Sequence, residues 1–130
     1  SYPLLKKLNL SKNLIKTIPA FISTLEQLQE LVLSTNKIRN IEQNSISSLK
    51  ALTLLDLREN GLEEFFEVPR STCFDSLILS YNRLNRFGNL RNAPNLTVID
   101  IKNNKIAKLP NELVHLENLK TLDLTNNDLS

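Results

Sequence analysis

The fold is set by the stretch Leu5-Lys6-Lys7-Leu8-Asn9-Leu10-Ser11-Lys12-Asn13-Leu14-Ile15, which has the form L-x-x-L-x-L-x-x-N-x-L. The same pattern begins again at Leu28, Leu52, Phe74, Leu96 and Leu119, so six copies fill the 130 residues. The asparagine of each copy recurs every 22 to 24 residues, at Asn13, Asn36, Asn60, Asn82, Asn104 and Asn127. A fixed period of this length indicates an array in which each copy packs against its neighbours.

Each copy contains two aliphatic residues separated by one position, such as Leu8 and Leu10 or Ile99 and Ile101. This alternation predicts a short strand with one buried face. Because all six strands run the same way, their stacking predicts a parallel sheet with the connecting segments on its opposite side. The recurrent asparagine follows each strand, where its amide can satisfy backbone groups that leave the sheet. We therefore expect the six asparagines to form a ladder.

The connecting segments carry apolar residues at spacings of three and four, which predict short helical or 3₁₀ pieces. The pattern is clearest in the first segment, residues 15–28, and in the fifth, residues 106–119. Pro19 and Pro110 fit the first position of such a piece, where a fixed φ is favourable. The third and fourth segments depart from this spacing, and we expect irregular or 3₁₀ backbone there.

The six segments resemble leucine-rich repeats over essentially the whole chain. The resemblance implies an α/β fold in which residues 1–130 form one right-handed solenoid, with a parallel sheet on its concave face and short helical, 3₁₀ or irregular convex segments. Copies that close with Ile-Pro or Leu-Pro, such as residues 104–110, resemble intracellular repeat proteins of the Ras-suppressor type. A solenoid needs polar terminal caps, and none is visible here. We therefore expect a fragment of a longer array with uncapped ends.

Composition excludes several classes of function. Sixteen Lys and Arg against 14 Asp and Glu leave a net charge of +2, which is too small for the basic field of non-specific nucleic-acid binding. No apolar run reaches the roughly 18 residues of a membrane-spanning helix. The single cysteine, Cys73, excludes an intrachain disulfide and modestly favours the cytoplasm. Because it precedes Phe74, a core position, we expect a small buried thiol.

The residues that can vary in such a fold are the sheet positions that point away from the core. Several are apolar where the fold does not require it, and strands about 4.8 Å apart bring them into one patch. Charged residues stand around this patch, which is the anatomy of a protein-binding surface. The alternative interpretation is that strand propensity alone selects these residues. The candidate partner-binding residues are Val32, Leu54, Asp56, Arg58, Ile78, Tyr81, Val98, Asp100 and Lys102.

Other chemistry has little support in the sequence. Asp56, Asp100 and Asp123 share one row of the predicted sheet, but few other metal ligands converge there. No nucleophile, base and orienting group occur together, so neither catalysis nor a cofactor is expected. His115 lies on a connecting segment, and we expect it to be solvated.

These observations predict a non-enzymatic scaffold that binds a protein partner through its concave face. One alternative is a fragment of an extracellular receptor or adhesion ectodomain. Two glycosylation sequons, Asn9-Leu10-Ser11 and Asn95-Leu96-Thr97, support it, although such tripeptides arise easily in an Asn-rich chain. The other alternative is a substrate-recognition or regulatory arm of a larger enzyme.

Overall fold

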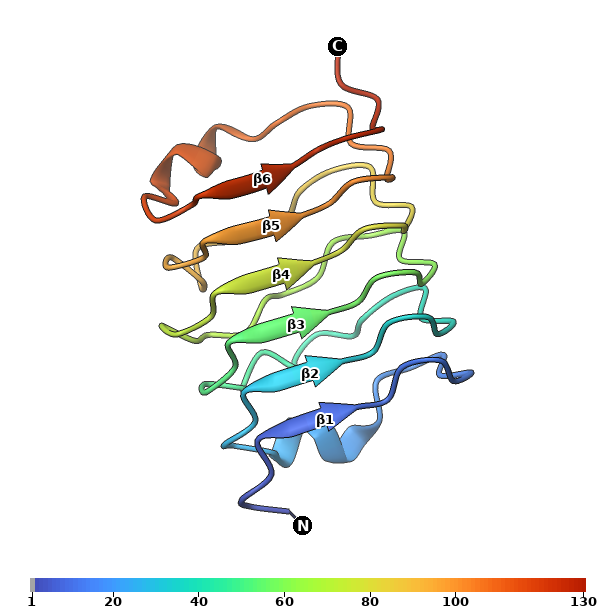
Figure 1. Cartoon of the computed structure of the whole chain (residues 1–130), viewed down its shortest axis with the longest axis vertical. Helices are drawn as coiled ribbons and strands as arrows, with labels where there is room; N and C mark the ends of the chain where they lie inside the picture. The colour runs from blue at the N-terminus through green and yellow to red at the C-terminus, as the bar shows by residue number, and fades with distance from the viewer. Residues whose placement is uncertain (1) are drawn as a thin grey trace.

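The structure is a computed structural model that describes residues 2–130, and its centre is one six-stranded parallel sheet (Figure 1). The strands lie side by side in chain order, so the prediction of one strand per repeat is confirmed. Their bounds are Lys7–Asn9 (β1), Glu30–Val32 (β2), Leu54–Asp56 (β3), Ser76–Ile78 (β4), Val98–Asp100 (β5) and Thr121–Asp123 (β6).

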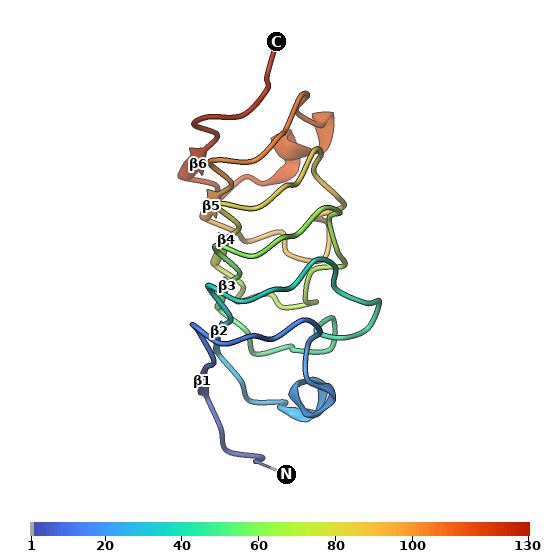
Figure 2. The same cartoon turned by 90° about the vertical axis from the view of Figure 1, so that its right-hand side faces the viewer.

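The connecting segments return behind the sheet, which therefore lines the concave side of a right-handed solenoid (Figure 2). The first segment contains the 3₁₀ helix η1 (Ala20–Thr24), and the fifth contains η2 (Asn111–His115), as the spacing predicts. Pro19 and Pro110 each stand one residue before these helices with extended ψ, rather than at the first helical position. Residues 2–130 contain no α-helix, because so short a repeat leaves little chain for one.

The core lies between the sheet and the return segments. In the four inner repeats, both aliphatic residues of the alternating pair have no exposed surface: Leu31, Leu33, Leu55, Leu57, Leu77, Leu79, Ile99 and Ile101. The equivalent residues of β1 and β6, Leu8 and Leu122, are only half-buried, because a neighbouring repeat covers them on one side alone. The stacking of repeats therefore supplies most of the burial, as expected for a solenoid.

Five of the six recurrent asparagines join consecutive repeats, and together they form the ladder that the sequence predicts. The Oδ1 atom of each accepts an N–H from the preceding repeat at 2.9–3.0 Å, as between Asn36 and Ile15. Each Nδ2 donates to a carbonyl oxygen of the preceding repeat and to its own strand end. Asn13, in the first repeat, bonds only to Leu10 and Ser11.

The residue before each ladder asparagine lies in the left-handed region, with φ between 54° and 60°. This conformation costs a non-glycine residue roughly 1–2 kcal/mol. The chain has only two glycines, and neither occupies such a position, so the ladder bonds hold the turn in place of glycine. The six residues are Lys12, Thr35, Glu59, Tyr81, Asn103 and Asn126.

The prediction of a buried thiol at Cys73 is wrong, because the residue is exposed. Its neighbour Phe74 fills the core, and Ser71 is buried on the other side, so the segment turns Cys73 outward between two inward positions. The Sγ atom lies 3.1 Å from Oγ of Ser71 and 3.7 Å from the carbonyl oxygen of Leu52.

Candidate functional site

The register of the sheet arranges the outward side chains in two rows that run across all six strands. The first row contains Lys7, Glu30, Leu54, Ser76, Val98 and Thr121. The second row contains Asn9, Val32, Asp56, Ile78, Asp100 and Asp123. The members on β2 to β5 are all half-buried, so each packs against its neighbours and still presents surface to a partner.

Apolar and polar side chains alternate in both rows over the inner strands β2 to β5. Val32 and Ile78 stand on either side of Asp56 in the second row, and Leu54 and Val98 stand on either side of Ser76 in the first. The four apolar residues therefore meet along diagonals of the sheet, where side chains still lie within reach of one another. The apolar centre is a checkerboard, in which every apolar side chain has polar neighbours on the adjacent strands.

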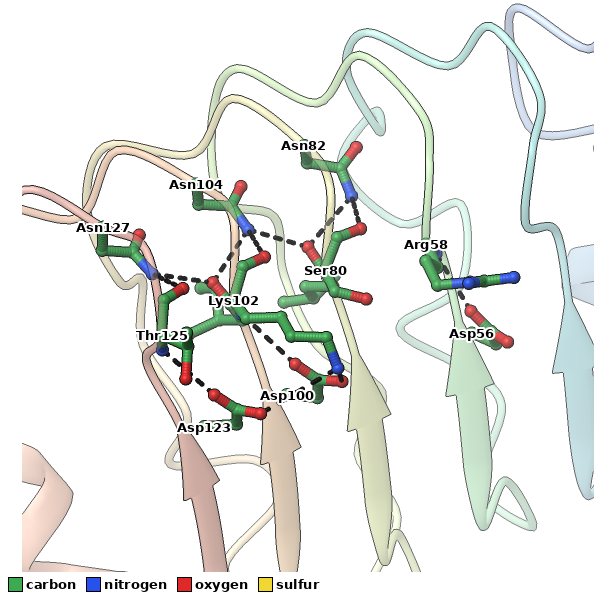
Figure 3. Close-up of polar contacts among 12 residues, drawn as sticks. Asp56, Arg58, Ser80, Asn82, Asp100, Lys102, Asn104, Asp123, Thr125 and Asn127 are labelled. Carbon is green, nitrogen blue, oxygen red and sulfur yellow. Dashed lines mark hydrogen bonds and ion pairs between the residues drawn. The ribbon is translucent and has the colours of Figure 1, made fainter.

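The acidic side chains of the second row bind the backbone. Oδ1 of Asp56 accepts the N–H two residues later at 3.0 Å, and Asp100 and Asp123 do the same at 3.2 and 3.0 Å (Figure 3). One carboxylate oxygen of each residue thus closes the turn that follows its strand. This structural role, which the sequence analysis missed, leaves the other oxygen of each residue for solvent, a cation or a partner.

Lys102 lies between two of these carboxylates (Figure 3). Its Nζ is 3.0 Å from Oδ2 of Asp100 and 3.9 Å from Oδ2 of Asp123. The hydrogen bond and charge of Asp100, followed by the charge of Asp123, raise the pKa of Lys102. Hydrogen bonds from Thr125, followed by the charge of Lys102, lower the pKa of Asp123. At the β5 and β6 end of the surface, one cation thus lies between two carboxylates.

Arg58 has a different environment. It is exposed, its side chain points away from Lys102, and its guanidinium has no hydrogen-bond or ion-pair partner among residues 2–130 (Figure 3). Between the two cations lies Ser80, which is fully buried and whose hydroxyl has no hydrogen-bond partner in this part of the chain. The site thus combines Lys102, which is paired with carboxylates, and Arg58, whose guanidinium is available to a carboxylate of a partner.

Tyr81 stands at the edge of the surface, just beyond β4. Its backbone N–H donates to the carbonyl oxygen of Lys102 at 3.0 Å, and the residue is 45% exposed. The structure therefore places all nine candidate residues on the open side of β2 to β5 or in the turns directly after these strands.

The other residues singled out in the sequence lie elsewhere. His115 is exposed on η2, as expected, and borders a convex cavity of about 370 Å³ beside Leu90, Pro94 and Leu113. This cavity is on the far side of the molecule from the nine candidates. In residues 2–130, no three His, Cys, Asp or Glu side chains are grouped to hold a metal ion. Neither 3₁₀ helix is long and apolar enough to cross a membrane.

Known proteins are similar to this chain in sequence. A family model described as "Leucine rich repeat" matches residues 3–62 and 74–129. Keratocan of Bos taurus is 37% identical over 131 residues, which cover 94% of this chain and 37% of that protein. Human keratocan is 41% identical over 106 residues, or 77% of this chain and 30% of that protein. The chain thus spans about a third of the length of these curated relatives.

A solved structure of a leucine-rich-repeat domain has a similar fold. The LRR ectodomain of the receptor kinase SOBIR1 from Arabidopsis thaliana matches with a TM-score of 0.73 and 30% sequence identity, over 95% of this chain and 71% of that chain. The repeat period, the parallel sheet, the asparagine ladder and these matches lead to one conclusion: the chain belongs to the leucine-rich-repeat family.

Proposed function

We propose that this domain is a non-enzymatic scaffold that binds a protein partner through the concave face of its sheet. The observation that supports the proposal most directly is the set of apolar side chains on the open side of the inner strands. Val32, Leu54, Ile78 and Val98 stand half-buried where the fold itself does not require apolar residues. A surface that combines apolar and charged groups in this way is typical of protein interfaces.

The mechanism we propose is preorganisation. Backbone pairing and the asparagine ladder hold consecutive repeats together, so the surface loses little conformational freedom when a partner binds. The apolar residues supply buried area, while Asp56 and Arg58 orient the partner through charge. Lys102 already forms an ion pair with Asp100, so we propose that it contributes mainly to the shape of the binding surface.

The test compares variants of the protein in quantitative affinity capture. Ile78→Asp and Leu54→Arg each place a charge in the apolar checkerboard, and we expect both to abolish partner binding without changing the circular-dichroism spectrum. Val114→Asp is the matched control, because Val114 is 76% exposed on the convex side. Proteins captured equally by the parent, Ile78→Asp and Leu54→Arg would contradict the proposal.

The similar proteins provide information on the cellular location of this protein and on the length of its repeat array. The matched SOBIR1 domain is an ectodomain, so this likeness does not support the cytoplasmic location expected from the cysteine count. Because the chain spans about a third of the keratocans, we infer that it belongs to a longer array. The enzyme-arm alternative is decided by the sequence that flanks these repeats.

A second candidate is a fragment of an extracellular receptor ectodomain, and the likeness to the SOBIR1 ectodomain favours it. The sequon at Asn95 lies on an exposed turn before β5, where Nδ2 donates to the carbonyl oxygen of Thr72 at 2.8 Å. Protein produced in a secretory host should lose mass on enzymatic deglycosylation. The same treatment should leave the mass of an Asn9→Gln/Asn95→Gln variant unchanged. An unmodified parent would count against this candidate.

A further inference from the structure

The chain leaves the sheet along one side wall of the solenoid, directly after each ladder asparagine. Backbone bonds of 2.7–2.8 Å link the first residue of this wall to the preceding repeat. The residues therefore stack in one column, Lys37, Gly61, Arg83 and Lys105. The column ends at Asp128, whose N–H donates to the carbonyl oxygen of Ile106 at 2.9 Å. Lys16, Arg39 and Arg86 follow shortly after the asparagines in their repeats. We call the wall that carries these six exposed cations the basic flank; they are Lys16, Lys37, Arg39, Arg83, Arg86 and Lys105.

The basic flank is continuous. It contains three shallow grooves. The groove beside Lys16 and the groove beside Gly61 share Lys37 and Arg39. The groove beside Lys16 and the groove beside Arg86 share Glu64. The grooves therefore run together along the long axis of the solenoid, past the ends of successive strands. A ligand that fits this shape is extended and makes similar contacts at several repeats.

The grooves of this wall carry more cations than carboxylates. Six cations face three carboxylates in the grooves, Glu59, Glu63 and Glu64, whereas the whole chain has a net charge of only +2. Glu63 forms an ion pair with Arg39 at 2.8 Å. Glu59 accepts the hydroxyl of Thr35 at 2.9 Å and keeps its negative charge. The other five cations have no ion-pair partner within residues 2–130, so they are available to an anionic ligand.

Gly61 opens a notch in the middle of the column. A Cβ atom there would make ordinary contacts with Cγ of Arg39 at 3.6 Å and the carbonyl oxygen of Ile38 at 3.7 Å, so the glycine leaves room that a methyl group could fill without a clash. Lys37 and Arg83 stand on either side of it in the column, and all three residues line one groove. An anionic group that enters the notch lies in a groove lined by Lys37, Arg39 and Arg83, together with the carboxylate Glu59.

We propose that the basic flank binds a linear sulfated polysaccharide. Its grooves contain only two large exposed apolar or aromatic side chains, Leu14 and Tyr81. That is too few for the apolar centre of a protein interface or for a row that stacks nucleic-acid bases. The flank also presents no helix or β-ribbon that enters the groove of a duplex. Long, flexible cations in a shallow groove suit a regular polyanion, whose binding releases counterions.

The proposal goes beyond the concave binding surface and does not rest on it. The six cations are all outside the nine candidate residues, and they lie on the side wall rather than on the open face of the sheet. Ile78→Asp should therefore leave polysaccharide binding unchanged. The failure of one proposal is thus distinguishable from the failure of the other.

The experiment measures the affinity of the protein for heparin as a function of salt concentration. The variant Lys37→Gln/Arg83→Gln removes the two cations beside the notch, and Lys6→Gln/Lys50→Gln removes two exposed cations elsewhere, so both have the same net charge. For the first variant we expect the slope of log Kd against log salt to fall by about two. Its affinity at about 0.1 M salt should weaken on the order of tenfold or more. The second variant should match the parent.

Four results would overturn the proposal. An equal loss in both double variants would show that only bulk charge matters, and an unchanged slope in the first would remove the notch from the site. Absence of heparin binding at about 0.15 M salt would exclude a specific site. Tighter binding of duplex DNA or polyglutamate than of heparin at the same salt would assign the flank to another ligand. Circular dichroism of each variant checks that the fold is intact.

Discussion

The backbone N–H of Leu62 donates to Oδ1 of Asn82, a residue 20 positions later in the chain, at 3.0 Å. The Nδ2 atom of the same asparagine donates to the carbonyl oxygens of Leu57, Leu79 and Ser80 at 3.0, 3.0 and 3.3 Å. A single buried amide thus contacts four backbone groups from two repeats. Because the same arrangement recurs in the neighbouring repeats, the ladder fixes the register in which the outward side chains line up.

Removal of one ladder amide should therefore destabilise the domain. Asn82→Ala leaves the buried N–H of Leu62 without a partner. It also removes one of two donors from the carbonyl oxygens of Leu57, Leu79 and Ser80. We expect the free energy of unfolding to fall by roughly 1–3 kcal/mol. Thermal and urea denaturation measure the change.

Asn13→Ala is the matched control for this experiment. Asn13 is exposed and bonds only within its own repeat, to Leu10 and Ser11. We expect a smaller loss, within about 0.5–1.5 kcal/mol for ordinary hydrogen bonds. Equal melting temperatures for Asn82→Ala and the parent would show that the ladder has no energetic role.

Tyr81 should limit stability, because it adopts φ of 58° in the left-handed region. Asparagine tolerates this region and occupies the same position in the last two repeats, at Asn103 and Asn126. Tyr81→Asn should raise the free energy of unfolding by about 0.5–1 kcal/mol. The urea midpoint should rise with an unchanged m value. Tyr2→Asn, at an exposed tyrosine outside the repeats, should have no effect, and a lower midpoint for Tyr81→Asn would refute the strain argument.

Gly88 and Gly61 should respond in opposite ways to substitution by alanine. A side chain at Gly88 would lie 2.6 Å from Cδ1 and 3.0 Å from Cβ of Phe65, whose ring stacks on Phe66 at 5.3 Å. We expect Gly88→Ala to lower the free energy of unfolding by about 1–3 kcal/mol through overpacking. Gly61→Ala meets only ordinary contacts and should be neutral, or stabilising by up to about 1 kcal/mol. Similar denaturation midpoints for the two variants would show that the Phe65 contact is not restrictive.

The parallel sheet and the ladder could be predicted because leucine and asparagine have the same role wherever they recur. Leu31 and Leu77 are buried by the same alternation, and Asn36 and Asn104 make the same bonds. The register of the outward rows follows from that alignment. Position alone therefore determined which side chains the sheet presents.

The features that could not be predicted depend on local backbone geometry that several different residue types can adopt. Five different residue types occupy the six left-handed positions, so no composition signal marked Tyr81 or Thr35. The outward turn of Cys73 depends on how an irregular segment places Phe74 in the core. The net charge of the chain also concealed the basic flank, because charges that cancel in the sum lie on different faces of the molecule.

The central claim is that each repeat is tied to the next through its asparagine, and amide hydrogen exchange tests it most directly. Five backbone N–H groups donate to ladder side chains, namely those of Ile15, Ile38, Leu62, Leu84 and Ile106. We predict that the inner three exchange as slowly as amides of the sheet, and that Asn82→Ala accelerates Leu62 more than Ile38. Exchange at the rate of an unstructured peptide at Ile38, Leu62 and Leu84 would contradict the account.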